Sequence, residues 1–449
     1  MKVLWVTNNS CSSAEMTGRQ METGGWLSAL EKEVRDYVEL EIAFLSNGRR
    51  QDDFTYRGVR YHPIAPFCSG SRILFRIKRL FMSWDRQDRL ILKRLGKIIR
   101  DSSPDIVHIH GTEKCFGLIY REMHGKDGCI AVGGRKIPIV ISIQGIMQEI
   151  VRKYFAGIPE EKAVKYGSIG AMLRKQSVMR RYRQLQHQAA DEAVILSETK
   201  FIIGRTDWDR AMTAGFNPER IYFHVGEIMR PEFYRGKARE DNDAGKRPVR
   251  LISTFSEGLY KGYELLLKVA AELKRKDTDY IWTVIGYTQK SETVSISEKA
   301  TGLHSSNLNV RFCGKMDAGS IVRELSRSDI YCQVSHIENS PNSLCEALLL
   351  GLPAIATNVG GTATVANNGI SASLVSDTSP AEYAKAIIRL AASPEGIISG
   401  EGSRIAALIH HDPERIRKQL TDTYTEIIGM AGNQERAVPE GTEKNEDSI

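Results

Sequence analysis

The chain has 449 residues, of which 41% are hydrophobic and 26% are charged, and its formal net charge is +7. This length allows two or three globular domains with substantial cores. The start, MKVLWVTNN, turns polar too early for a signal peptide, and no later run approaches the ~18 apolar residues of a membrane span. We therefore expect a cytoplasmic protein. Seven scattered cysteines without a C-x-x-C pair favour neither a disulfide framework nor a zinc site.

The first half of the chain alternates strand-like runs with helical patterns. Strands are expected at KVLWVT, VELEIAFLS, DIVHIH and IPIVISIQG, and the first helix is expected from about Gly25 to Tyr37. Alternation of this kind predicts a parallel sheet that is covered by helices on both faces.

A strongly basic segment, residues 72–100, lies between the second and third of these strands. It holds ten Lys or Arg against Asp85 and Asp88, a local charge of +8, and its apolar residues recur at helical spacing. The helix can simply pack on the core with a solvated basic back, or it can also contact an anionic membrane surface. Nucleic acid is not an expected partner, because no aromatic-lined basic repeat accompanies the segment.

The second half repeats the alternation. Strands are expected at VRLISTF, YIWTVIG, NVRFCG, SDIYCQVS and LPAIAT. The charged, aperiodic run RGKAREDNDAGKRP reads as a linker. We therefore predict an α/β protein with two doubly wound, Rossmann-like domains facing across a cleft. The expected boundaries are residues 1–234 for the first domain, completed by a helix at 412–430, residues 248–411 for the second, and a disordered tail at 431–449.

The stretch HIENSPNSLCEALLLGLPAIA begins in a loop at the end of a predicted strand. We expect Ser340 to cap the helix that follows, Pro341 to be its first residue and Gly351 to stop it. The free amides at the helix start, together with the helix dipole, predict an anion site that suits a diphosphate. These amides belong to Asn342, Ser343 and Leu344.

Two acids flank this helix start. Glu346, about one and a half turns into the helix, can accept hydrogen bonds from a vicinal diol such as a ribose. Glu338, in the loop, is then left for a group on the other side of the phosphates.

The same stretch resembles the signature of the family 4 glycosyltransferases, retaining enzymes of the GT-B fold with two Glu separated by seven residues. GGWLSAL resembles the Gly-rich first loop of that family, YKGYELLL its Lys-Gly donor site, and VRFCGKM the strand before the signature. IIGRTDWDRA with YFHVGEIMRPEFY further resembles a branch that builds bacterial surface polysaccharides. The similarity covers roughly residues 1 to 430.

The resemblance implies a role for each matching residue. Glu346 would hold the nucleotide ribose, Lys261 would neutralise the diphosphate, and Glu338 would bind sugar hydroxyls beside the anomeric carbon. Glu338 and Lys261 are thus the expected catalytic residues. Gly25, in the first loop, would contact the substrate. The implied reaction transfers a sugar from a nucleotide sugar to a glycan acceptor, lipid-linked in capsule, O-antigen or exopolysaccharide assembly, without a metal or other cofactor.

The chain departs from the family pattern at several places, of which two concern the charges and protons at the site. Many relatives carry an Arg five residues before the Lys, whereas this chain has Ser256, so Arg205 is expected to share the phosphate charge. Relatives often have His-Gly where this chain has Gln144 and Gly145. Glutamine can orient a sugar but cannot transfer a proton, which argues against an enzymic base.

Two further patterns raise the question of a metal. His108 and His110 alternate along a strand, and we expect them on opposite faces, with His110 at the strand end lining the acceptor side. Asp207 and Asp209 match the Asp-x-Asp of metal-dependent transferases, but they open a helix, where acids favour the dipole. No metal site is expected.

Other functions remain open on the sequence alone. The missing Arg at Ser256 suits a non-catalytic protein that binds nucleotide sugars. A GT-B phosphorylase or epimerase is also possible, although an epimerase needs an acid and a base beside the sugar and Gln144 supplies neither.

Overall fold

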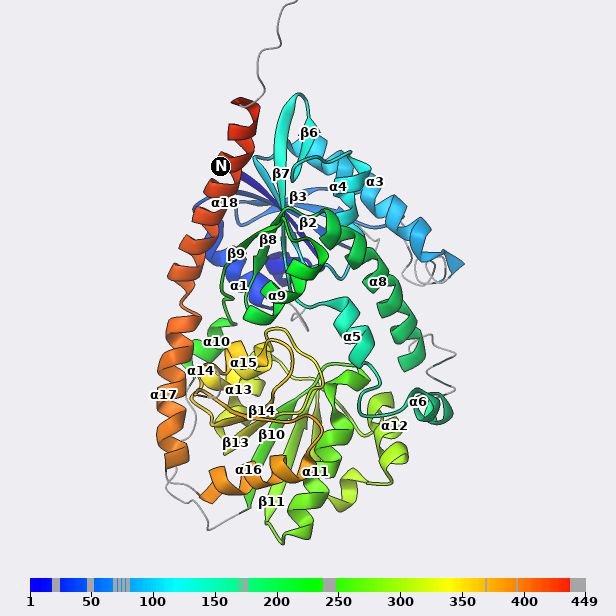
Figure 1. The fold of residues 1–449 in the computed structure, drawn as a ribbon, viewed down its shortest axis with the longest axis vertical. Helices are drawn as coiled ribbons and strands as arrows, with labels where there is room; N and C mark the ends of the chain where they lie inside the picture. Colours follow the sequence, from blue (N-terminus) through cyan, green and yellow to red (C-terminus); the bar gives the residue numbers. More distant parts are fainter. Residues whose placement is uncertain are drawn as a thin grey trace, which may run out of the picture.

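The computed structural model shows two α/β lobes, one above the other in Figure 1. It describes residues 1–17, 25–46, 52–67, 81–168, 177–236, 248–367, 370–392 and 395–436, together with the single residues 71, 74, 77, 170 and 172. The predicted linker falls mostly outside these ranges.

The first lobe is built on a sheet with the strand order β3-β4-β2-β1-β5-β7-β8-β9, in which β6 also pairs with β7. Its described ladders are parallel except β3–β4 and β6–β7. The strands are β1 (Lys2–Thr7), β2 (Glu39–Leu45), β3 (Phe54–Tyr56), β4 (Val59–Ile64), β5 (Ile106–His110), β6 (Cys129–Val132), β7 (Arg135–Ser142), β8 (Phe201–Gly204) and β9 (Ile221–His224). The strand order reverses between β1 and β5.

Both faces of this sheet are buried, as a parallel sheet requires. Alternate side chains of β1 therefore pack on opposite faces of the sheet. Val3 and Trp5 belong to one hydrophobic cluster, and Leu4 and Val6 belong to another. The helices of the first lobe are α1 (Gly25–Val34), α3 (Trp84–Ser102), α4 (Ile119–Glu122), α5 (Met147–Lys153), α8 (Val178–Glu198) and α9 (Asp207–Phe216), with 3-10 turns at Cys11–Thr17 and Cys115–Leu118. Two further helices of this half of the chain pack against the second lobe: α6 (Glu160–Tyr166) contacts α12 (Glu292–Thr301), and α10 (Pro231–Arg235) contacts α13 (Ala318–Ser326) and α14 (Asn342–Leu349).

Helix α3 carries the predicted basic segment. Its apolar face packs into the first lobe, where Ile91, Leu95 and Ile99 are buried. Exposed basic side chains recur every three or four residues, at Arg86, Arg89, Lys93, Lys97 and Arg100, and the acidic Asp85 and Asp101 are exposed near the two ends of the helix. Among the described residues, no helix has both the length and the apolar character needed to cross a bilayer.

The second lobe has the strand order β12-β11-β10-β13-β14-β15, and its described ladders are parallel. The strands are β10 (Val249–Thr254), β11 (Tyr280–Ile285), β12 (Val310–Gly314), β13 (Ile330–Gln333), β14 (Ala354–Thr357) and β15 (Ser373–Val375). The helices are α11 (Tyr263–Arg275), α12 (Glu292–Thr301), α13 (Ala318–Ser326), α14 (Asn342–Leu349), α15 (Thr362–Val365), α16 (Pro380–Ala392) and α17 (Glu395–His410), with 3-10 turns at Leu259–Lys261 and Ser305–Asn307.

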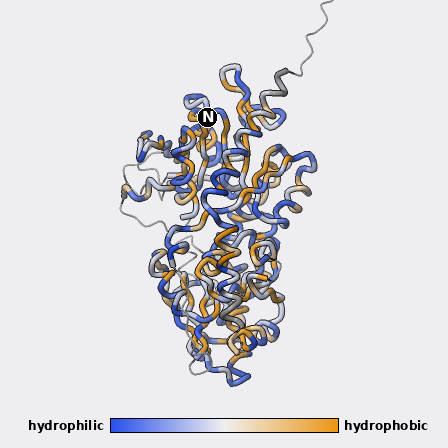
Figure 2. Tube along the Cα trace, turned by 90° about the vertical axis from the view of Figure 1, so that its left-hand side faces the viewer, coloured by the Kyte–Doolittle hydropathy of each residue, from blue (hydrophilic) through white to orange (hydrophobic). Residues whose placement is uncertain are grey.

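The order of this sheet reverses between β10 and β13. In open α/β sheets ligands bind at such a reversal, outside the carboxyl ends of the strands. Hydrophobic stretches run through both lobes (Figure 2). The predicted pair of doubly wound α/β domains is therefore confirmed.

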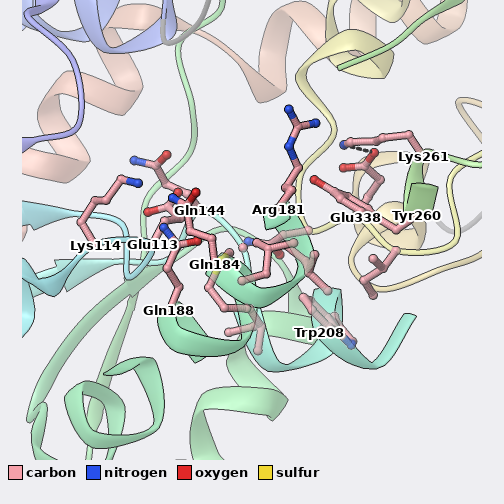
Figure 3. A pocket seen from close by; sticks show the side chains of 17 residues that line it. Glu113, Lys114, Gln144, Arg181, Gln184, Gln188, Trp208, Tyr260, Lys261 and Glu338 are labelled. Atoms are coloured by element: carbon pink, nitrogen blue, oxygen red, sulfur yellow. Dashed lines mark hydrogen bonds and ion pairs between the residues drawn. The ribbon is translucent and has the colours of Figure 1, made fainter. Parts of the chain in front are cut away.

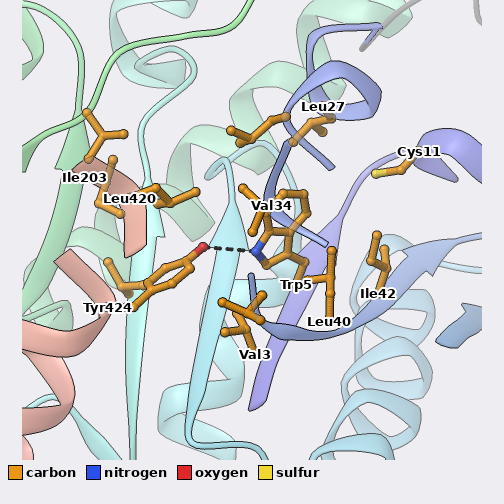
Figure 4. Close-up of a cluster of buried hydrophobic side chains, with 14 of the residues drawn as sticks. Val3, Trp5, Cys11, Leu27, Val34, Leu40, Ile42, Ile203, Leu420 and Tyr424 are labelled. Carbon is orange, nitrogen blue, oxygen red and sulfur yellow. Dashed lines mark hydrogen bonds between the residues drawn. The ribbon is translucent and has the colours of Figure 1, made fainter. Parts of the chain in front are cut away.

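The last helix, α18 (Pro413–Arg436), returns to the first lobe along one side of the molecule (Figure 1). Ile416 and Tyr424 join the core that contains Trp5. The Trp5 indole donates a hydrogen bond to the Tyr424 hydroxyl at 2.9 Å (Figure 4). The helix continues to Arg436, so the expectation of a disordered tail from residue 431 was wrong for 431–436, while 437–449 lie outside the described residues.

The first lobe also reaches across to the second through α5 and α6. The backbone amides of Ser168 and Val178 donate to the Glu292 carboxylate, at 3.0 and 2.8 Å, and Lys162 donates to the Ala300 carbonyl at 3.0 Å. The lobes are thus joined beside α12 as well as along α17 and α18.

Candidate functional site

Two cavities that are open to solvent lie between the lobes, each of about 390 Å³ and lined by described residues. One lies at the start of α14, between the ends of β10 and β13, and is called the α14 cavity here. The other is lined by α8 and the loops after β5 and β7, and is called the α8 cavity. Lys261 and Glu338 line both cavities, so this pair stands where the two spaces meet.

Lys261 and Glu338 are bonded to each other. The Lys261 ammonium donates to Glu338 Oε1 at 2.6 Å (Figure 3). The Ser335 hydroxyl donates to the same oxygen at 2.8 Å. Burial alone would lower the pKa of Lys261, but the Glu338 carboxylate raises it above its usual value. Lys261 is therefore a permanent positive charge at this junction.

Gly262 fixes the turn that presents Lys261. Its φ of 74° lies in the left-handed region, and a Cβ there would lie 1.9 Å from the carbonyl oxygen of Val334. A side chain would push Lys261 away from β13 and from Glu338. The Lys-Gly pair that the sequence singled out is thus required by the backbone.

Helix α14 starts one residue later than expected. Pro341, not Ser340, is its N-cap residue, and Gly351, with a φ of 76°, follows its C-terminal end. The amide of Leu344 donates to the Pro341 carbonyl at 2.9 Å, so the prediction that it is free was wrong. The amides of Asn342 and Ser343 keep no backbone acceptor among the described residues, and both residues line the α14 cavity.

Glu346 lies one turn along α14 from Asn342 and faces the same cavity. Its carboxylate is held by both arms of the Arg230 guanidinium, Nε to Oε1 at 2.7 Å and Nη2 to Oε2 at 2.8 Å. Burial raises the pKa of Glu346, and the charge of Arg230 opposes that effect. Arg230, which precedes α10, was not predicted as a site residue, although it belongs to the stretch YFHVGEIMRPEFY that the resemblance includes.

Ser256 and Gly25 also line the α14 cavity. Ser256 follows β10 and brings no charge there. A Cβ on Gly25 would lie 2.7 Å from Cδ of Arg230, so the glycine leaves room for that side chain. The absence of a side chain at Gly25 thus allows Arg230 to lie in its observed position.

Arg205 does not reach the cavities. Its guanidinium pairs with the buried Glu227 carboxylate at 3.0 Å and lies 4.4 Å from the ring centroid of Trp26. Glu227 in turn accepts a hydrogen bond from the Ser340 hydroxyl at 3.2 Å. Glu227 is thus the charge partner of Arg205 in this structure. The expectation that Arg205 shares the phosphate charge stays a prediction.

The prediction for the two β5 histidines was wrong as well. Residues two apart on a strand share a face, and the rings of His108 and His110 lie 3.8 Å apart rather than on opposite faces. His110 is only 1% exposed and lines neither cavity. Burial lowers the pKa of both rings, so they are neutral members of the core.

The α8 cavity is lined by amide and charged side chains together with apolar ones such as Ile150, Leu185 and Trp208 (Figure 3). Gln144 takes part as expected, and Gln184 and Gln188, one turn apart on α8, face it. The other charged lining residues are Glu113, Lys114 and Arg181. The position of Glu113 and Lys114 just after β5 is a signal that the sequence analysis could have used.

The Asp-x-Asp sequence has a structural role. Asp209 completes a capping box with Thr206 at the start of α9, as its place at a helix start suggested. It also accepts a hydrogen bond from the Asn339 side-chain amide at 3.0 Å, while the Thr206 hydroxyl donates to Asn339 Oδ1 at 2.7 Å. Asn339, which follows Glu338, thereby ties the site loop to the first lobe.

Within the described ranges, one group has the character of metal ligands: the side chains of Asp88, His187 and Asp191, with ligand atoms within 4.8 Å of one another. These residues line neither cavity. His187 already bonds Asp88 at 3.0 Å. The group is therefore separate from the Lys261 and Glu338 junction.

Comparisons with known proteins agree with this architecture. Residues 237–396 match the profile of the family described as Glycosyl transferases group 1. The 2-deoxystreptamine N-acetyl-D-glucosaminyltransferase of Niallia circulans is 26% identical over 198 residues, 44% of this chain and 48% of that protein. The D-inositol 3-phosphate glycosyltransferase of Geodermatophilus obscurus is 30% identical over 145 residues, 32% of this chain and 31% of that protein. The chain thus spans about half or less of these curated relatives.

Solved structures match over most of the chain. Sucrose-phosphate synthase from Thermosynechococcus elongatus has a TM-score of 0.69 at 13% identity, covering 96% of this chain and 100% of the other. Anabaena Alr3699/HepE in complex with UDP and glucose has a TM-score of 0.61 at 12% identity, covering 95% and 99%. WaaG, a glycosyltransferase involved in lipopolysaccharide biosynthesis, has a TM-score of 0.58 at 13% identity, covering 94% and 99%. The chain therefore has the GT-B fold, and its residues 237–396 match the glycosyl transferases group 1 family.

Proposed function

We propose that the protein is a retaining, metal-independent glycosyltransferase of the family 4 type that moves a sugar from a nucleotide sugar to a glycan acceptor. The observation that carries the proposal is the Lys261–Glu338 pair, which lines both cavities. The donor occupies the α14 cavity, the acceptor occupies the α8 cavity, and the transferred sugar passes between them at this pair. Complexes of Alr3699/HepE with UDP and with UDP-glucose support a nucleotide-sugar donor.

The residues of the α14 cavity suit a departing diphosphate. Negative charge grows on the phosphate as the sugar–phosphate bond breaks, while the sugar ring becomes oxocarbenium-like. Lys261 and the amides of Asn342 and Ser343 stabilise the phosphate charge, and Glu346 takes the ribose hydroxyls. Glu338 accepts hydrogen bonds from the sugar beside its anomeric carbon.

Retention follows if the acceptor hydroxyl enters on the face that the diphosphate leaves. A phosphate oxygen of the leaving group can then take the acceptor proton. Gln144, Gln184 and Gln188 offer amide groups that can orient sugar hydroxyls without exchanging a proton. This chemistry requires no protein base.

For the biological setting, we infer that the acceptor is a lipid-linked glycan of capsule, O-antigen or exopolysaccharide assembly, and that the protein works at the inner face of a membrane. Support comes from the basic face of α3 and from Phe81 just before it, whose side chain is 83% exposed. Basic groups beside an exposed aromatic residue suit an anionic bilayer. Arg76, Lys78 and Arg79, which belong to the same predicted basic segment, lie outside the described residues.

The test is nucleoside diphosphate release from a panel of nucleotide sugars with lipid-linked glycan acceptors. Glu338→Gln and Lys261→Ala are each expected to lower turnover by about tenfold to a hundredfold or more, because each removes a charge-assisted contact to the reacting groups. Lys418→Ala is the matched control, since Lys418 forms an exposed pair with Asp422 at 2.7 Å on α18.

Three results would count against the proposal. Turnover that survives both cavity variants would remove the site assignment. Product formation that depends on free inorganic phosphate would indicate a phosphorylase. Binding of nucleotide sugars without turnover on any acceptor would indicate a non-catalytic binding protein, the function that Ser256 favours.

A further inference from the structure

The α14 cavity contains a cation that the sequence pattern did not suggest. Ser256, where relatives carry an Arg, supplies no charge, yet Arg230 lines the same cavity as Ser256 and Lys261. Arg230 precedes α10 and therefore enters the cavity from outside the second sheet. The cavity therefore contains a guanidinium group, although the position where many relatives carry an Arg is occupied by Ser256 in this chain.

Arg230 is anchored but not sealed off. Its guanidinium makes the two bonds to Glu346 described above, and its side chain keeps 24% of its exposure, against 9% for Glu346. The carbon atom of the guanidinium lies 4.7 Å from the ring centroid of Phe233, and Gly25 leaves room for the aliphatic part of the side chain. The charged end therefore borders the open cavity while its stem is held.

The cavity is lined by two cation–carboxylate pairs, Lys261 with Glu338 and Arg230 with Glu346. Their four charges cancel. A diphosphate needs uncompensated cations, and carboxylates that bind sugar and ribose hydroxyls need free oxygens. Both needs are met if the cations turn to the phosphates as the carboxylates turn to the hydroxyls.

We propose that Arg230 is the second diphosphate-binding cation of this site, held by Glu346 until a nucleotide sugar replaces that contact. The inference rests on the proposed function and deepens it. A planar guanidinium can exchange a bidentate carboxylate contact for a bidentate phosphate contact, which a lysine cannot do equally well. Arg230 thus binds the diphosphate in place of the Arg that many relatives carry at the position of Ser256.

The experiment measures binding of UDP, GDP, ADP and the matching nucleoside monophosphates by titration calorimetry. Arg230→Gln is expected to weaken diphosphate binding by about tenfold to a hundredfold and to lower the preference for diphosphate over monophosphate. If Arg230 only positions Glu346, the affinities for the nucleoside diphosphate and for the matching monophosphate fall by the same factor. The preference for diphosphate over monophosphate is then unchanged. That result would overturn the inference.

A second variant tests whether diphosphate affinity can be restored as well as lost. Ser256→Arg, added to Arg230→Gln, restores a cation at the position where relatives have one, and it is expected to recover at least tenfold in diphosphate affinity. Arg230→Lys, which keeps the charge but not the fork, is expected to be intermediate. A double variant no better than Arg230→Gln, with the melting temperature unchanged, would contradict the inference.

Arg311→Gln is the control, because Arg311 pairs with Glu324 on the surface of the second lobe. It should bind every nucleotide as the wild type does. If the wild type binds diphosphates and Arg230→Gln matches this control, the inference fails while the proposed function stands. If the wild type binds none of the nucleotides and releases none from nucleotide sugars, both fail.

Discussion

His336 stands two residues before Glu338 and is enclosed between two acids. Its Nε2 lies 2.7 Å from Glu264 Oε1, and its Nδ1 lies 3.0 Å from Asp377 Oδ2. A Cβ on Gly157, in the segment that reaches across from the first lobe, would lie 1.7 Å from Glu264 Oε1. The charge of one buried histidine therefore supports both the site loop and the contact between the lobes.

This arrangement predicts a loss of stability at alkaline pH. Burial alone would lower the pKa of His336, but Asp377 and Glu264 raise it from 6.5 to about 9. A raised folded-state pKa gives stabilisation that is complete below about pH 6.5 and is lost as the pH rises through about 9. A shift of this size corresponds to roughly 3 kcal/mol.

The check is the unfolding free energy of the wild type and of His336→Gln, measured from pH 6 to pH 10 (about one point per pH unit). The wild type should be more stable at pH 6, and the difference should shrink as the pH passes about 9. His304→Gln, at an exposed histidine of the same lobe, should show no such pattern. A constant difference across the range would rule out this charged state of His336.

At the scale of elements, α18 follows the second lobe in the sequence but packs against the first lobe. It leaves the second lobe and completes the first core, where Leu420 and Ile427 are buried beside Val3. Its Tyr424 hydroxyl lies 2.9 Å from Trp5 Nε1 (Figure 4). The same hydroxyl lies 2.5 Å from His108 Nδ1. The hydroxyl therefore satisfies polar groups of two strands of the first sheet.

Tyr424→Phe should destabilise the protein by about 1–3 kcal/mol, because the buried indole N–H of Trp5 loses its acceptor while the ring volume is kept. Tyr37→Phe is the control, since that side chain is 62% exposed. Urea unfolding monitored by tryptophan fluorescence measures the effect. Equal costs for the two variants would show that the Tyr424 hydroxyl contributes nothing to the first core.

At the scale of the whole molecule, the junction of the cavities depends on both lobes. Glu338 and Lys261 come from the second lobe, whereas Gln144 and Arg181 come from the first. Asn339 bonds Asp209 across the gap, and Glu292 bonds the amides of Ser168 and Val178. The relative position of the lobes therefore sets the distance over which a sugar would pass.

The basic face of α3 predicts that the protein binds anionic membranes. The double variant Lys93→Gln/Lys97→Gln should weaken binding to vesicles containing phosphatidylglycerol by roughly 2 kcal/mol, about thirtyfold, because each basic group near the surface contributes about 1 kcal/mol. Co-sedimentation measures the effect, and added salt should reduce wild-type binding.

Lys385→Gln/Arg389→Gln is the matched control, since these residues are exposed one turn apart on α16 of the second lobe. Its binding should equal that of the wild type. If binding persists unchanged in the α3 variant, or if pure phosphatidylcholine vesicles bind equally well, the basic face is not a lipid contact.

The sequence by itself determined the α/β alternation, the two parallel sheets and the stretch that carries Glu338 and Glu346. These are local properties: hydrophobic runs set the strands, and the loop after a parallel strand must open at the ligand-binding edge of its sheet. Even so, local reasoning misplaced the cap of α14 by one residue, because Pro341 offers a carbonyl but no amide and Leu344 and Cys345 bond to it.

Only the tertiary structure decided which charges meet. Arg230 and Glu346 are 116 positions apart, and nothing near either one in sequence indicates the other. The pairing of Arg205 with Glu227, and the cover of His110 by Trp5 and Trp26, are likewise contacts between residues far apart in the sequence. Electrostatic partners are set by distances in space, which depend on how the sheets, helices and lobes pack together, whereas a sequence pattern reports the neighbours of a residue along the chain.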